Sequence, residues 1–521
     1  MIPHRNRLLK PPVRTEESLP KNPAKNVSPP NPRRRKLHCS PLGRLFALTL
    51  AAITLAAYPL CAAPLPAIRV APDGRGFVTS DGKPFIPWGV NYYRPGTGWA
   101  PQLWKKFDAA ATRQNFARLK AHGVNCIRVF LTYGSFYQEK GRLSSEGLER
   151  LDQLLALGEE FGIYIHPTGP DHWEGLPAWA AKDRMASEEV LSALEEFWRL
   201  MAARYKGRGV IFAYDLLNEP EMPWDSPALK ERYARWVKEQ YGTPEKAAQA
   251  WGLPENTFQG GLRPPEPKDK PRDPWLLDYQ KFRESVADEW TRRQVAAIKS
   301  ADPNALVTVG LIQWSIPAVL PSLRHYSAFK PARQAPMLDF LEFHFYPLAQ
   351  GAYEYRSAED EWRNLAYAEC LAREVSKAGK PVVLAEMGWY GGDKKPRFGG
   401  GRHPQADEEQ QARWCRRLVQ TTAGFVTGWL NWGFYDQPEA TDVSEQTGLM
   451  TAQGETKAWG REFHRLSRRL EGQSIPLRTL PPRPEMDWDL LLTSQAAARE
   501  FMEQYYKAFR ENPSPTPALV E

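Results

Sequence analysis

The chain has 521 residues, of which 42% are hydrophobic and 12% aromatic, and its formal net charge is +8. This length and apolar content allow one large domain or two ordinary ones. The positive charge does not indicate a nucleic-acid partner, because residues 1–63 carry eleven Lys or Arg against two Glu and the rest of the chain is close to neutral.

Residues 1–63 have the composition of a targeting segment. A Pro-rich polar stretch, predicted to be disordered, and the basic "NPRRRKLHCSPLGR" precede an apolar run, Leu45 to Leu60, that is short for a membrane span. "CAAPLPA" follows, with small residues that suit a signal peptidase. We therefore predict a disordered basic leader plus signal peptide, and a secreted or periplasmic protein with no stable membrane span once mature. An uncleaved membrane anchor is the alternative.

The cysteines give no sign of a disulfide framework or a metal site. Cys126, Cys370 and Cys415 lie outside the leader, odd in number and widely spaced. Buried thiols are expected, and no His, Cys or Asp cluster suggests a metal or an organic cofactor.

After the leader, eight strand-like runs alternate with helical stretches. Most of the runs are apolar throughout, which is typical of strands buried on both faces of a parallel sheet. The runs are residues 85–91, 125–130, 163–167, 210–220, 305–311, 338–347, 381–388 and 428–434. Helical stretches between them suit right-handed crossovers, so eight units predict an α/β fold, a closed (β/α)8 TIM barrel. A doubly wound sheet is the alternative, but no Gly-rich phosphate turn follows the first run.

Two regions exceed a minimal barrel. Residues 225 to about 275, between the fourth and fifth strands, contain helical sequence and the Pro-rich "GLRPPEPKDKPRDP", which predicts a helical insertion with an irregular loop. A Pro-rich stretch after about residue 470 precedes the amphipathic "AAAREFMEQYYKAFRE", which predicts an external helix and a frayed end. We therefore divide the chain into a leader, 1–63, a catalytic domain, 64–470, and a C-terminal tail, 471–521.

Carboxylates stand at the ends of two of the predicted strands. The fourth run ends in Asn218-Glu219 and the seventh in Glu386. Catalytic residues of such barrels lie at the carboxyl ends of the strands, and strands four and seven face each other across the mouth. Two facing carboxylates are what glycoside hydrolysis needs, one to protonate the leaving oxygen and one to attack the sugar or activate water.

Four short motifs carry a resemblance to a known family. "NEP" after the fourth strand, "FHFYP" at the sixth, "AEMG" at the seventh and "NWGF" at the eighth resemble glycoside hydrolase family 5 over residues 70–460. This is the cellulase and mannanase family of clan A, with (β/α)8 folds and a retaining mechanism. The resemblance implies that Glu219 is the acid/base, that Glu386 is the nucleophile, and that Asn218 binds the sugar 2-hydroxyl.

Four further residues match supporting positions of that family. Tyr346 matches the tyrosine that hydrogen-bonds the nucleophile, and His344 the histidine near the acid/base. Arg128 matches the strand-two arginine that supports the nucleophile, and Trp432 the aromatic platform under the sugar. Arg128 also suits a structural ion pair, and the other three suit ordinary core positions.

The sequence departs from the family after the third strand. Many members carry Asp-x-His there, whereas this chain has "IYIHPTGPDHWEGLPAW", in which His166 or His172 could take the place of that histidine. We expect two or three of the tryptophans that follow strand ends to contact substrate. They are Trp99, Trp173, Trp224, Trp314 and Trp389.

The sequence leaves the substrate open. The insertion's "WVKEQYGTPEKAAQAWG" and the following "DYQKFRESVADEW" resemble family 42 beta-galactosidases, which share the same catalytic positions but mostly remove terminal galactose. We expect a monomeric retaining β-glycosidase acting on a polysaccharide or oligosaccharide, with β-mannan or β-1,4-glucan favoured. The alternatives are an exo-acting β-galactosidase-like enzyme, a transglycosidase and a non-catalytic carbohydrate-binding barrel.

Overall fold

The computed structural model describes residues 64–97, 102–181, 183–347, 357–388, 407–440, 443–476 and 479–521. They all belong to a single compact unit. The leader of residues 1–63 lies outside the described residues, and so do Trp99 and Trp389. Among the described residues, no helix combines the length and the apolar character needed to cross a membrane.

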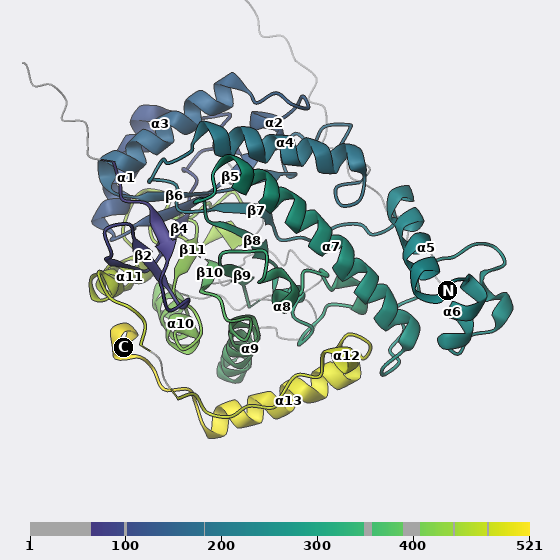
Figure 1. Cartoon of the computed structure of the whole chain (residues 1–521). Coiled ribbons are helices and arrows are strands. Elements are labelled where there is room, and N and C mark those ends of the chain that lie inside the picture. Colours follow the sequence, from purple (N-terminus) through teal and green to yellow (C-terminus); the bar gives the residue numbers. More distant parts are fainter. Residues whose placement is uncertain are drawn as a thin grey trace, which may run out of the picture. The chain divides into compact units, whose positions relative to one another are not determined.

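Eight parallel strands close into a barrel, as the sequence predicts (Figure 1). In chain order the strands are β4 (Trp88–Asn91), β5 (Cys126–Thr132), β6 (Tyr164–Asp171), β7 (Tyr214–Asn218), β8 (Val307–Leu311), β9 (Leu341–Phe345), β10 (Val382–Met387) and β11 (Trp429–Trp432). Every one of their residues is buried, which explains the uninterrupted apolar runs. The barrel closes where β11 pairs with β4.

Helices connect the strands and surround the barrel (Figure 1). The α-helices are α1 (Ala109–Ala121), α2 (Tyr133–Phe136), α3 (Ser145–Phe161), α4 (Glu188–Arg204), α5 (Pro227–Tyr241), α6 (Pro244–Ala250), α7 (Pro274–Ala301), α8 (Pro331–Gln334), α9 (Ala358–Ser376), α10 (Glu408–Thr422), α11 (Ala458–Leu470), α12 (Trp488–Leu491) and α13 (Gln495–Glu511). Their starts follow ordinary capping chemistry: Asp108 caps α1 and Ser144 caps α3 through side-chain oxygens.

A small antiparallel sheet precedes the barrel, and the sequence analysis missed it. Strands β1 (Ile68–Val70), β2 (Phe77–Thr79) and β3 (Pro84–Phe85) form it, so the predicted first run of 85–91 divides between β3 and β4. The Phe77 ring packs edge-on against Phe212 and Phe340, both at 5.2 Å between centroids. These two residues precede β7 and β9, so the sheet covers the amino end of the barrel and leaves the carboxyl end for chemistry.

The insertion between β7 and β8 is helical, as expected. It contains α5, α6 and the 3₁₀ turn Glu255–Phe258, and an irregular stretch leads into α7. Ser226 caps α5 and is followed by Pro227 at the first helical position.

The C-terminal helix packs on the outside of the barrel, but the chain end is not frayed. On α13, Tyr505 donates to Glu369 of α9 at 3.1 Å, and buried Arg483 pairs with the same carboxylate at 2.7 Å. Figure 1 shows α13 alongside α9. The predicted loose end is wrong: Val520 is fully buried, and Gln420 and Arg465 donate to the last two backbone carbonyls.

Candidate active site

Glu219 lies directly after β7 in an unusual backbone conformation. Its φ is +44°, a left-handed value that a residue with a β-carbon adopts at a cost of about 1–3 kcal/mol. Its amide donates to the Gly310 carbonyl of β8 at 2.9 Å, which holds this conformation. Pro220 then prevents the strand from continuing. The Asn-Glu-Pro sequence therefore ends the strand and turns Glu219, whose side chain is 29% exposed, toward the barrel mouth.

Glu386, at the end of β10, is bound on both carboxylate oxygens. Arg128 Nη1 donates to Oε1 at 2.7 Å, and the Tyr346 hydroxyl donates to Oε2 at 2.8 Å. The side chain is only 5% exposed. Two charge-assisted contacts fix its orientation, as a nucleophile requires.

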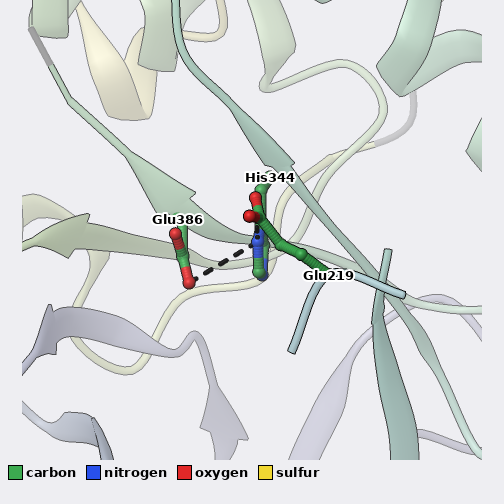
Figure 2. A group of neighbouring side chains, drawn as sticks. All are labelled: Glu219, His344 and Glu386. Atoms are coloured by element: carbon green, nitrogen blue, oxygen red, sulfur yellow. Dashed lines mark hydrogen bonds and ion pairs between the residues drawn. The ribbon is translucent and has the colours of Figure 1, made fainter. Parts of the chain in front are cut away.

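The two carboxylates lie close together with His344 between them (Figure 2). His344 Nδ1 is 3.0 Å from Glu219 Oε1 and 3.5 Å from Glu386 Oε1. One oxygen of each carboxylate and one nitrogen of the histidine all lie within 4.8 Å of one another. The structure thus brings together three residues that are 42 to 167 positions apart in sequence.

Arg128 is the fully buried centre of the site. It binds Asp215 through Nε at 3.2 Å and Nη2 at 2.7 Å, and its Nη2 donates to Asn218 Oδ1 at 3.0 Å. Gly310 makes room for it, because a β-carbon there would lie 3.0 Å from Nη2. Removing Arg128 would therefore release Glu386 and leave buried carboxylates without their cation.

The environment gives the two carboxyls different proton affinities. Burial raises the pKa of Glu219 to about 7, and the nearby charge of Glu221 reinforces the rise. Burial also raises the pKa of Glu386, but the charge of Arg128 and the Tyr346 hydrogen bond oppose that rise. Burial lowers the pKa of His344 to about 4, so its imidazole is neutral at pH 7. Glu219 thus keeps its proton up to about neutral pH, whereas the contacts from Arg128 and Tyr346 favour the charged form of Glu386.

Trp432 lies in a cluster of aromatic rings that includes Tyr346, the hydrogen-bond partner of Glu386. Tyr93, Phe130, Tyr346 and Trp432 form it, and Trp432 Nε1 donates to Ser444 Oγ at 3.0 Å. The ring is 5% exposed. Its position next to Tyr346 is compatible with a sugar platform.

The two histidines considered at the third strand have different surroundings. His166 is fully buried and contacts Ala213 and Glu342, so it lies inside the barrel. His172 lies beyond β6, where it stacks on Trp173 with ring centroids 4.7 Å apart, and its buried Nδ1 has no hydrogen-bond partner. Among the described residues, no hydrogen bond or ion pair joins His172 to Glu219 or Glu386.

The remaining predicted tryptophans differ in exposure. Trp173 is 56% exposed and is the one large hydrophobic side chain in the described ranges with such exposure. Trp314 is buried, and half-buried Trp224 stacks under the guanidinium of Arg283 at 4.4 Å. Of the three predicted tryptophans that the structure describes, Trp173 is thus the one whose ring is most accessible from solvent.

Sequence reasoning missed the buried polar groups beneath the site. Asp215 accepts from Arg128, from Thr168 and from the Gly310 amide, and Arg128 lowers its pKa against the effect of burial. Asn91 accepts from Arg128, and Glu342 lies 3.9 Å from Arg128 Nε. The available signal was a carboxylate inside an apolar run, as in "AYDLLNEP" and "LDFLEFHFYP".

Glu219, His344 and Glu386 could also offer three ligand atoms to a metal ion. Arg128 already occupies Glu386 Oε1 and adds a positive charge beside the position that a cation would take. That charge repulsion favours the trio as acid/base machinery over a metal site.

Residues 78–436 match the family model described as Cellulase (glycosyl hydrolase family 5). The chain is 22% identical over 348 residues to mannan endo-1,4-beta-mannosidase F of Aspergillus clavatus, covering 61% of this chain and 65% of the relative. It is 24% identical over 287 residues to beta-galactosidase BgaA of a Thermus species, covering 50% of this chain and 41% of the relative. The chain thus spans less than two thirds of the length of these two relatives.

Solved structures share the fold. A GH5_18 variant from Streptomyces cattleya, in complex with Manb1-4GlcNAc, superposes with a TM-score of 0.57 at 19% identity, covering 82% of this chain and 92% of that one. The beta-galactosidase of Rahnella sp. R3 gives a TM-score of 0.61 at 16% identity, covering 81% of this chain and 63% of that one. On the family match over residues 78–436, the chain belongs to glycosyl hydrolase family 5.

Proposed function

We propose that the protein is a retaining β-glycosidase. Protonated Glu219 gives its proton to the glycosidic oxygen while Glu386 attacks the anomeric carbon, so the glycosidic bond breaks and a glycosyl-enzyme forms. Glu219, now a carboxylate, takes a proton from water, whose oxygen attacks the same carbon and releases Glu386. The observation that carries the proposal is the approach of the two carboxylates to within 4.8 Å, because retaining enzymes hold these groups about 5–5.5 Å apart and inverting enzymes about 6.5–9.5 Å.

The neighbours support distinct roles for the supporting residues. The neutral His344 carries its proton on Nδ1 and donates it in a hydrogen bond to Glu219 Oε1. The proton that Glu219 transfers to the substrate then lies on Oε2. Asn218, held by Arg128 through its Oδ1, keeps its amide NH2 for a sugar hydroxyl. Tyr346 and Arg128 stabilise the charge of Glu386 before attack and as the nucleophile departs.

The substrate we favour is a β-1,4-linked mannan, with β-1,4-glucan as the nearest alternative. Relatives named as mannan endo-1,4-beta-mannosidases support this choice. A terminal β-galactoside is the second candidate, favoured by the similarity to named beta-galactosidases. We also propose that the enzyme is a monomer. We further propose that it acts outside the cytoplasm after loss of its leader, a location that the basic and then apolar sequence of residues 1–63 supports.

The experiment that tests the function is hydrolysis by the chain from Ala67 onward. Mannan, glucomannan, cellulose derivatives, β-1,3/1,4-glucan and an aryl β-galactoside are the substrates, and Glu386→Gln is the blank. Sugar released from a polymer with its anomeric configuration retained, and absent from the blank, would support the proposal. Inverted product would contradict the mechanism, and release only from the galactoside would favour the second candidate.

The pH dependence should report the proton on Glu219. Because the protonated form is the acid and its pKa is about 7, kcat/KM on a natural glycoside should fall tenfold per pH unit above about pH 7. Measuring kcat/KM from pH 4 to 10 locates this limb. Glu221→Gln removes the negative charge that raises this pKa, so its alkaline limb should lie at lower pH with the maximal rate retained.

Trp173 should contribute to binding rather than to chemistry. Loss of its exposed ring in Trp173→Ala should raise KM for a polymer about fivefold, equivalent to about 1 kcal/mol of stacking, with kcat unchanged. Hydrolysis of a short aryl glycoside should not change. A similar rise in KM on the polymer and on the short aryl glycoside would show that Trp173 does not bind the longer chain.

A further inference from the structure

A buried Glu–His pair lies beneath Arg128 on the inner side of the barrel. His166 Nδ1 is 2.8 Å from the Ala213 carbonyl oxygen, and His166 Nε2 is 2.9 Å from Glu342 Oε2. Both side chains are fully buried. The mechanism proposed above uses neither of them.

The hydrogen-bond partners fix where protons can lie. A carbonyl oxygen can only accept, so His166 Nδ1 carries hydrogen and a neutral ring has a bare lone pair on Nε2. A bare lone pair facing an ionised carboxylate at 2.9 Å would be repulsive. One proton must therefore lie between Nε2 and Glu342 Oε2.

The second oxygen of Glu342 indicates which atom holds that proton. Oε1 is buried without a hydrogen-bond partner, and Arg128 Nε is beyond hydrogen-bond reach at 3.9 Å. An ionised carboxylate would leave this charged oxygen unsatisfied, whereas a protonated one leaves a neutral carbonyl oxygen, which costs less. Burial and the charge of Asp215 also raise the pKa of Glu342, against the opposing effects of His166 and Arg128.

We propose that Glu342 keeps a proton, donated to His166, and that this uncharged pair is a positioning device for Arg128 and Glu386. With the pair uncharged, Arg128 faces two carboxylates, Asp215 and Glu386. If Glu342 ionised beside a neutral His166, three carboxylates would share one guanidinium, and repulsion would drive Glu386 to take up a proton. The assignment of the proton to Glu342 rests on the contacts of the pair, and the effect on Glu386 rests on the proposed function.

The groups that face this pair come from several strands. Each could change the balance of charge and must be kept intact in the test. They are Cys126 and Arg128 on β5, Asp215 on β7 and His344 on β9.

Two conservative substitutions separate the role of the proton from that of shape. In Glu342→Gln the amide NH2 can donate to His166 Nε2 and cannot ionise, so the acid limb of kcat/KM should stay within about 0.3 pH units of wild type. In His166→Asn the amide can still donate to the Ala213 carbonyl, but Glu342 loses its acceptor and can ionise. The acid limb should then rise by about 1 pH unit.

The double variant decides whether ionisation of Glu342 causes the shift. Glu342→Gln with His166→Asn should return the acid limb to the wild-type position, because no carboxyl remains to ionise. Failure of this rescue, or an equal shift in Glu342→Gln alone, would overturn the effect on Glu386. Thermal unfolding of each variant shows which of them are folded.

An infrared measurement tests the proton without any activity. The spectrum of wild type minus Glu342→Gln at pH 8 should contain the C=O stretch of a protonated carboxyl that shifts in D2O. A carboxylate band instead would overturn the proposal. If the wild type hydrolyses nothing yet shows the protonated band, the proposed function fails while the proton assignment stands.

Discussion

Replacing Glu386 by Gln should lower kcat by about 10⁴-fold or more on every substrate that the enzyme accepts. An amide cannot attack the anomeric carbon, so no glycosyl-enzyme can form whatever the leaving group. The amide can still accept from Arg128 and contact the Tyr346 hydroxyl, so the fold should be retained. Steady-state kinetics on a natural glycoside and on an activated aryl glycoside, with thermal unfolding alongside, measure both effects.

Glu221→Gln is the matched control for this loss. Glu221 is also a glutamate near the site, but its side chain is 49% exposed and lies 3.6 Å from His325 Nε2. At the pH optimum of each enzyme, its substitution should leave kcat within about threefold of wild type, because Glu221 acts only on the pKa of Glu219. A near-normal rate in Glu386→Gln, or an equal loss in the control, would remove the nucleophile assignment.

The barrel was predictable because its strands carry a strong local signal. Strands buried on both faces read as apolar runs, and the polar residues that end them, such as Glu219 and Glu386, stand out against that background. Each of the eight predicted runs overlaps one strand of the barrel, and the predicted limits differ from the observed ones by a few residues. Resemblance to glycosidase motifs then implied roles for individual residues. In the structure Arg128 and Tyr346 donate to Glu386, and His344 lies within hydrogen-bond distance of Glu219.

The features that escaped prediction depend on contacts between distant segments. Strands β1 to β3 have only two or three residues each, too few for any periodicity to appear. The Glu342–His166 pair joins residues 176 positions apart, so neither strand alone shows why a charged residue is buried. The docking of Val520 depends on Gln420, a hundred positions earlier. Such pairings follow from the closed barrel and not from any local pattern.

Replacing Glu219 by Gln should have an effect that depends on the leaving group. Natural glycosides leave as poor alkoxides that need a proton, so their kcat/KM should fall by about 10³-fold or more. An aryl glycoside with an acidic phenol leaves without that proton and should form the glycosyl-enzyme at a nearly normal rate. The second step then becomes slow, because no carboxylate remains to activate water. A burst of phenol followed by a slow steady state is the expected signature.

An added small anion distinguishes this role from that of Glu386. Azide needs no general base, so it should accelerate the slow second step of Glu219→Gln and give a β-glycosyl azide, formed by two inversions at the anomeric carbon. It should not restore a two-step reaction in Glu386→Gln, where the first step is missing. The proposed division of roles rests on the surroundings of the two residues: Glu386 is fixed by Arg128 and Tyr346, whereas Glu219, with a pKa of about 7, is more exposed and contacts the neutral His344. An equal loss of activity on the natural and the aryl glycoside in Glu219→Gln, with no burst and no response to azide, would contradict the acid/base assignment.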